Sequence, residues 1–143
     1  MMKTNFIKLS IIFMTILMMF NACSNRPHDS KIIIRDISTQ AAYQLISENE
    51  NSKSFKILDV RTSAEYKRGA IENAINLNYN SSDFEEQLEK LDKTSTYLIY
   101  CQYGGRSKRA LEIMEELGFQ KAYNLSEGII GWESAGYSIT GEK

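Results

Sequence analysis

The stretch TYLIYCQYGGRS, residues 96–107, decides how this chain is expected to fold. Its first five residues, 96–100, are mostly β-branched or aromatic and predict a buried strand. Apolar residues then recur with helical spacing and predict a helix over 107–117 that Gly118 ends. The inward positions of that helix are Ala110, Leu111, Met114 and Leu117. A strand, a glycine turn and a helix in succession are typical of a parallel sheet with helical crossovers.

The segments on both sides of this stretch continue the alternation of strands and helices. Further strands are expected at 31–34, 55–60, 74–77 and 121–124. Further helices are expected at 38–49, after Thr62, after Ser82 and at 129–135. Such alternation with short links predicts an α/β fold in a single domain, with a mostly parallel central sheet flanked by helices on both faces.

Capping residues mark where three of these helices should begin. Ser38 can accept hydrogen bonds from the first free amides of the 38–49 helix. Thr62 and Glu65 have the spacing of a capping box, in which each side chain bonds the other residue's backbone amide. Ser82 and Glu85 repeat that spacing and predict a third helix start.

The first residues have the composition of a targeting segment. Lys3 and Lys8 precede an apolar run over 9–20, and Ala22 follows shortly after it. A positive region, a short apolar run and a small residue before the cleavage point are typical of a secretory signal peptide. The run is shorter than the roughly 20 residues that a membrane-spanning helix needs.

The end of that segment, Phe20-Asn21-Ala22-Cys23, resembles the lipobox of bacterial lipoproteins. The resemblance implies that residues 1–22 are a signal peptide and that Cys23 carries lipid. It also implies a protein of the cell envelope, lipid-anchored and facing the periplasm or the outside. Ordinary cleavage that leaves Cys23 as a free thiol is the alternative. Residues 23–30 are polar and are expected to form a flexible tether before a folded domain over 31–143.

The overall composition excludes several classes of function. Of the 143 residues, 43% are hydrophobic and 24% are charged, which is typical of a globular protein. A net charge of -1 gives no electrostatic reason to bind nucleic acid. Two cysteines and one histidine cannot supply a four-ligand zinc site, so neither a metal nor a cofactor is expected. His28 lies in a polar stretch, which makes catalysis by a histidine base unexpected.

The turn after the 96–100 strand combines features that favour a reactive thiol. Cys101 follows the carboxyl end of a strand, where open α/β sheets bind their ligands. Gly104 and Gly105 let backbone amides turn inward, and the next helix begins with free N–H groups. Arg106 adds a permanent positive charge. Such surroundings stabilise a thiolate, although a buried structural cysteine before an ordinary glycine turn is the alternative.

Residues 101–107 resemble the active-site loop of the rhodanese-type sulfurtransferases. Two further segments agree with this resemblance. The 57–77 segment, which contains Asp59 and Arg61, is similar to the family's upstream motif. The 125–136 segment, with its Gly128 and Trp132, is similar to the family's C-terminal motif. The chain departs from the family at Ala70, where a histidine is frequent, and at Glu127, where a second glycine is frequent.

The resemblance implies that Cys101 takes sulfane sulfur from a donor, such as thiosulfate or a persulfide, and passes it to a thiophilic acceptor. Cys101 and Arg106 are then the expected catalytic residues. Asp59 and Arg61 either support the loop or form a purely structural ion pair. The residues expected to bind substrate are Gln102, Tyr103, Gly104, Gly105 and Ser107. The partners would be a small anionic or thiol-bound donor, a thiol acceptor and, through the lipid, the membrane; a monomer is expected.

Other functions remain open at this point. Cys101 through Arg106 spans six residues, whereas the related phosphatases and arsenate reductases have one more residue in this loop. A non-catalytic binding or sensing module would not need Cys101, and a thiol oxidoreductase would need a second cysteine nearby. Gln102 and Tyr103 carry no positive charge, so weak binding of the thiosulfate dianion is expected.

Overall fold

The computed structural model describes residues 32–141, which form a five-stranded sheet flanked by helices. The elements in chain order are β1 (Ile33–Ile37), α2 (Thr39–Glu48), β2 (Phe55–Asp59), α3 (Ser63–Arg68), β3 (Ala74–Asn76), α4 (Phe84–Glu89), β4 (Thr96–Tyr100), α5 (Gly105–Glu116), β5 (Lys121–Leu125) and α6 (Gly128–Ser134). The strand order is β1-β5-β4-β2-β3, and all neighbouring strands are parallel. The α/β class expected from the sequence is confirmed.

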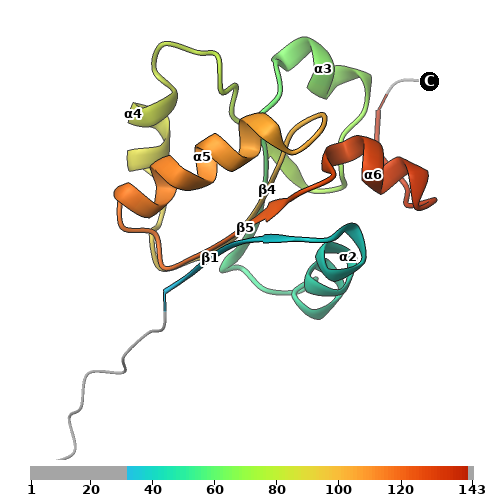
Figure 1. Cartoon of the computed structure of the whole chain (residues 1–143), viewed down its shortest axis with the longest axis horizontal. Coiled ribbons are helices and arrows are strands. Elements are labelled where there is room, and N and C mark those ends of the chain that lie inside the picture. Colours follow the sequence, from blue (N-terminus) through green and yellow to red (C-terminus); the bar gives the residue numbers. More distant parts are fainter. Residues whose placement is uncertain (1–31, 142–143) are drawn as a thin grey trace, which may run out of the picture. The chain divides into compact units, whose positions relative to one another are not determined.

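Alternate residues of the strands face opposite layers of helices, as expected for a sheet that is buried on both sides. Figure 1 shows α5 on one side of the strands and α2 on the other. The layer that contains α4 and α5 packs on Leu58, Ile99 and Ala122, and the opposite layer packs on Ile57, Leu98 and Leu125. The central strand β4 is buried from Tyr97 to Tyr100 and lies between β2 and β5.

Two of the predicted helix starts are confirmed and one is wrong. Ser38 caps α2, and the capping box of Thr62 and Glu65 opens α3. The Ser82–Glu85 box does not form, because α4 begins one residue later with Asp83 as its N-cap. Ser81 donates a hydrogen bond to the Asp83 carboxylate, which places the turn before Phe84 and leaves Ser82 exposed.

The first strand and the helix after β4 also differ from the prediction. β1 extends to Ile37 because it pairs with the whole of β5, Ile33 opposite Lys121 and Ile37 opposite Leu125. The β-branched run at 31–34 therefore marks only the start of that strand. Helix α5 begins at Gly105 instead of Ser107, because Gly104 adopts a left-handed conformation and turns the chain directly into the helix.

The predicted signal peptide, Cys23 and the tether lie outside the described residues. Within residues 32–141, no helix is long and apolar enough to cross a membrane.

Candidate active site

The cysteine loop lies at the carboxyl edge of the sheet. Cys101 directly follows β4, and residues 102–104 join it to the first turn of α5. The ends of the two neighbouring strands lie on either side of it: Asp59 ends β2 and Leu125 ends β5. The loop is thus placed where the fold leaves backbone groups free to meet a ligand.

Hydrogen-bond donors surround the sulfur of Cys101. The Ser107 hydroxyl lies 3.4 Å from Sγ and is also 3.1 Å from the Gly104 carbonyl oxygen. Burial raises the pKa of the Cys101 thiol, but hydrogen bonds from the Ser107 hydroxyl and from the amides of Ser107, Tyr103 and Arg106 lower it more, so the net shift is downward. The loop therefore stabilises a thiolate without a histidine.

Cys101 is more deeply buried than the tip of its loop. Cys101 is only 2% exposed, whereas Tyr103 at the tip of the loop is 73% exposed. Cys101 lies at the binding edge of the sheet, as the sequence predicts, but the residue itself is buried.

The turn after β5 and the first turn of α6 hold the loop in place. The amide of Ile129 donates to the Cys101 carbonyl oxygen at 2.9 Å, and the amide of Ile130 donates to the Gln102 carbonyl oxygen at 3.3 Å. Gly104 and Gly128 both have positive φ, and a Cβ atom at either one would clash with backbone across this contact. The two backbones pack too closely for any larger residue.

A polar side chain on β5 also reaches the loop. Asn124 is 2% exposed, and its Nδ2 donates to Asp36 at 2.8 Å and to the Gly104 carbonyl oxygen at 3.4 Å. Asp36 in turn lies 3.6 Å from Lys108 on α5. These contacts link the edge strand β1 to the loop through the sheet.

Arg106 forms an ion pair with Glu65 in the first turn of α3. Its Nη2 lies 2.6 Å from Oε1 and its Nη1 lies 3.0 Å from Oε2, so the contact is bidentate. Hydrogen bonds from Arg106 lower the pKa of Glu65 to about 2, although burial opposes them. Glu65 raises the pKa of Arg106 against burial, and the charge and a hydrogen bond of Cys101 add to this effect. The guanidinium is therefore paired with the carboxylate, and the charge of a Cys101 thiolate also favours its protonated form.

Asp59 and Arg61 form a second ion pair at the end of β2. Arg61 Nη2 lies 2.6 Å from Asp59 Oδ2 and 2.5 Å from the Gly69 carbonyl oxygen. Both side chains are buried, at 6% exposure for Arg61 and 0% for Asp59. Arg61 Nη1 also lies 3.5 Å from Gln102 Oε1, so this buried pair contacts the loop.

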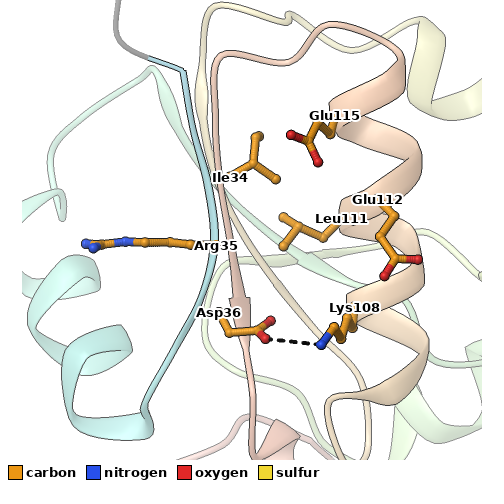
Figure 2. Close-up of a pocket in the computed structure, with 7 residues that line it drawn as sticks. All are labelled: Ile34, Arg35, Asp36, Lys108, Leu111, Glu112 and Glu115. Atoms are coloured by element: carbon orange, nitrogen blue, oxygen red, sulfur yellow. Dashed lines mark ion pairs between the residues drawn. The ribbon is translucent and has the colours of Figure 1, made fainter.

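Pockets open on the described surface at two places that bear on the site. One of about 160 Å³ lies beside the loop, lined by Arg61, Glu65, Arg68, Gly69, Gln102, Ile129, Glu133 and Ile139. The other, of about 180 Å³, lies between β1 and α5, where Figure 2 shows Asp36 facing Lys108 while Arg35 points away. No cluster of potential metal ligands occurs among residues 32–141.

Sequence reasoning misses two residues that touch the loop. The capping-box spacing explains Glu65 as a helix cap and gives no hint of its contact with Arg106. Glu65 follows β2 and Arg106 follows β4, and these two strands are parallel neighbours in the sheet. Their position at the same edge of the sheet is the signal from which their contact could have been predicted. Asn124 falls in a predicted strand without a role, although a polar residue in an otherwise buried strand requires a partner.

Comparison with known proteins identifies the group to which these features belong. The family model described as "Rhodanese-like domain" matches residues 38–135. A sulfurtransferase of Allochromatium vinosum is 27% identical over 107 residues, covering 75% of this chain and 95% of that protein. A tRNA uridine(34) hydroxylase of Cytophaga hutchinsonii is 35% identical over 91 residues, covering 60% of this chain but only 29% of that protein. The crystal structure of a rhodanese-related protein from Thermoplasma volcanium is 30% identical, with a TM-score of 0.62, covering 76% of this chain and 99% of that one.

Proposed function

Because this chain belongs to the rhodanese-like domain family, we propose that it is a sulfurtransferase that carries sulfane sulfur on Cys101. The observation that carries the proposal is the cradle of donors around one thiol: the Ser107 hydroxyl and three backbone amides lower the pKa of Cys101 although burial raises it. A thiolate is the form that attacks sulfur. The same donors can stabilise the persulfide anion that replaces it.

The reaction would proceed in two steps that conserve atoms and charge. The Cys101 thiolate attacks the outer sulfur of the donor, a new S–S bond forms, and the donor's own bond to that sulfur breaks. With thiosulfate as donor, sulfite leaves with the electron pair. A thiophilic acceptor such as a thiolate or cyanide then attacks the outer sulfur of the Cys101 persulfide and regenerates the thiolate. Arg106 and the loop amides would hold the anionic donor and the developing charge on the leaving group.

The test is the mass of the protein after exposure to thiosulfate, followed by addition of cyanide. We expect Cys101 to gain one sulfur atom and to lose it when thiocyanate forms. Cys101→Ala should gain nothing. Cys23→Ser is the matched control, because it removes the other of the two cysteines and should leave sulfur loading unchanged. Loading that persists without Cys101, or wild-type protein that never loads from thiosulfate or a persulfide, would contradict the proposal.

We also propose that the chain is attached to the cell envelope through lipid on Cys23. The support is the sequence of residues 1–23, a positive and apolar segment that ends in a lipobox-like tetrapeptide. Metabolic labelling with a fatty acid should mark the wild type, and Cys23→Ser should remain unlabelled. Labelling that survives this substitution would contradict the assignment of Cys23.

A further inference from the structure

Glu65 holds Arg106 in a fixed arrangement beside the loop. The Thr62 amide and hydroxyl donate to Glu65 Oε2 at 3.0 and 2.6 Å, and the Glu65 amide donates back to the Thr62 hydroxyl at 3.3 Å. Both carboxylate oxygens also accept bonds from Arg106. Since the carboxylate is oriented by its own helix, Arg106 meets a preformed negative charge before any donor arrives.

Glu65 neutralises the positive charge of Arg106, and no other positive charge beside the loop takes its place. Arg61 is neutralised by buried Asp59. Arg68 and Glu133, which also line the 160 Å³ pocket, are exposed and opposite in sign. Gln102 and Tyr103 are uncharged. Among these residues, therefore, no net positive charge remains to match a dianion.

We propose that Glu65 determines which donor charge the loop accepts: by neutralising Arg106 it favours monoanionic donors, with sulfane sulfur bound to a carbon-bearing group, over the thiosulfate dianion. Glu65 acts through Arg106 and is in this sense a positioning residue. The inference rests on the proposed function and deepens it, because it assigns the donor class to one ion pair.

A comparison of two sulfur donors separates the effect of donor charge from the effect of the reaction itself. Thiosulfate and the methanethiosulfonate anion both present a terminal sulfur on an oxidised sulfur centre. Attack by the Cys101 thiolate forms the same persulfide from each, and the electron pair of the broken S–S bond leaves with sulfite or with methanesulfinate. The first donor carries two negative charges and the second carries one. Cyanide accepts the sulfur in both assays, so only the first step differs.

The variant that tests the proposal is Glu65→Gln. Glutamine serves at this position of a capping box as glutamate does, so α3 keeps its start while Arg106 loses its counter-charge. We expect kcat/KM for thiosulfate to rise about tenfold, mainly through KM, at the low end of what charge in a cleft achieves. The value for methanethiosulfonate should change less than about threefold, and added salt should weaken the gain with thiosulfate.

Glu86→Gln is the matched control. Glu86 lies on α4 and forms an exposed ion pair with Lys90 at 2.7 Å, so the substitution removes one negative charge and one ion pair away from the loop. This substitution should leave kcat/KM unchanged with both donors. A comparable gain with thiosulfate in Glu86→Gln would assign the effect to net charge and overturn the proposal.

A second measurement does not depend on sulfur transfer. Iodoacetamide alkylates the thiolate form of Cys101, and peptide mass spectrometry measures the rate of this reaction. The rate across a range of pH reports the fraction of Cys101 that is deprotonated. In Glu65→Gln the midpoint should move to lower pH, because the Arg106 charge then acts on the sulfur without a carboxylate beside it.

The outcomes separate the two proposals. If kcat/KM of Glu65→Gln falls equally with both donors and the alkylation midpoint is unchanged, Glu65 serves only the fold and the inference is overturned. If the wild type loads sulfur from neither donor nor from a persulfide, the proposed function fails. The alkylation midpoint of Glu65→Gln then still decides whether Glu65 controls the charge at the loop.

Discussion

Two arginine–carboxylate pairs lie beside the cysteine loop, and they differ in burial and in span. Asp59 and Arg61 are two residues apart, at the end of β2, and their side chains are 0% and 6% exposed. Glu65 and Arg106 are 41 residues apart, joining α3 to the loop, and their side chains are 18% and 25% exposed. The shortest contact is 2.6 Å in both pairs, so distance alone does not distinguish them.

Burial gives the two pairs different roles. A charge that is buried without its partner is costly, so the Asp59–Arg61 pair cannot open while the protein stays folded. Water can replace a lost partner in the Glu65–Arg106 pair, and an anionic donor can compete with Glu65 for the guanidinium. The first pair should therefore dominate stability, and the second should dominate reactivity.

The largest expected effect is on folding. Asp59→Ala leaves the Arg61 charge buried, and we expect the free energy of unfolding to fall by about 3–5 kcal/mol. Glu65→Ala removes a partly exposed partner and half of a capping box, and should cost about 1–2 kcal/mol. Urea denaturation of both variants and the wild type measures the difference. Equal losses would mean that burial does not distinguish the two pairs.

Replacing each arginine by lysine separates the two roles further. Arg106→Lys keeps the charge, but lysine cannot bind an anionic donor with two parallel N–H groups, so kcat/KM for sulfur transfer should fall about 10–100-fold with little change in stability. Arg61→Lys should instead destabilise the fold, because its buried contacts with Asp59 and Gly69 require the guanidinium. Sulfur-transfer kinetics and urea denaturation of both variants measure the two effects.

Arg109→Lys on the exposed side of α5 is the control for both substitutions and should change neither property. If Arg106→Lys unfolds the protein as readily as Arg61→Lys does, the division of roles is wrong.

The sequence predicts those features of this site that depend on neighbours along the chain. Strand 96–100, the glycines after it and the Thr62–Glu65 capping box are all set by residues within a few positions of one another. The sheet-edge rule then places Cys101 correctly, because that rule requires only the order of strands and helices.

The remaining features depend on contacts between distant segments. The Glu65–Arg106 pair requires β2 and β4 to be neighbours, and the contact of Asn124 with Asp36 requires β5 to pair with β1. The close packing of Gly104 against Ser126 and of Gly128 against Gln102 is likewise a contact between distant segments. No local pattern in the sequence contains this information, so the sequence does not predict how deeply Cys101 is buried.

A smaller effect is expected when one donor to the sulfur is removed. Ser107→Ala eliminates the side-chain hydrogen bond that lowers the pKa of Cys101, so this pKa should rise and alkylation at neutral pH should slow several-fold. Iodoacetamide kinetics against pH measures both. The matched control is Ser47→Ala on α2, whose hydroxyl donates to the Tyr43 carbonyl oxygen at 3.0 Å far along the chain from the loop. An unchanged pH profile of alkylation in Ser107→Ala would show that the backbone amides alone lower the pKa of Cys101.

The smallest expected effect is the pH dependence of the stability that the Glu65–Arg106 pair contributes. The pKa of Glu65 is lowered from 4.5 to about 2 in the folded protein, first by Arg106. Its stabilisation is therefore fully present above about pH 4.5 and is lost as pH falls toward 2. Because the pair is partly exposed, we expect a loss of about 1 kcal/mol or less.

Other carboxylates titrate in the same range, so the informative measurement is a difference between two proteins. The free energy of unfolding of the wild type is compared with that of Glu65→Gln, once near neutral pH and once at the lowest pH at which both proteins still fold. The difference should shrink at the lower pH, because a protonated glutamate and a glutamine both lack the negative charge that pairs with Arg106. A difference that stays constant would mean that Glu65 stabilises the fold through its capping bonds alone, and that its charge acts only on the reactivity of the loop.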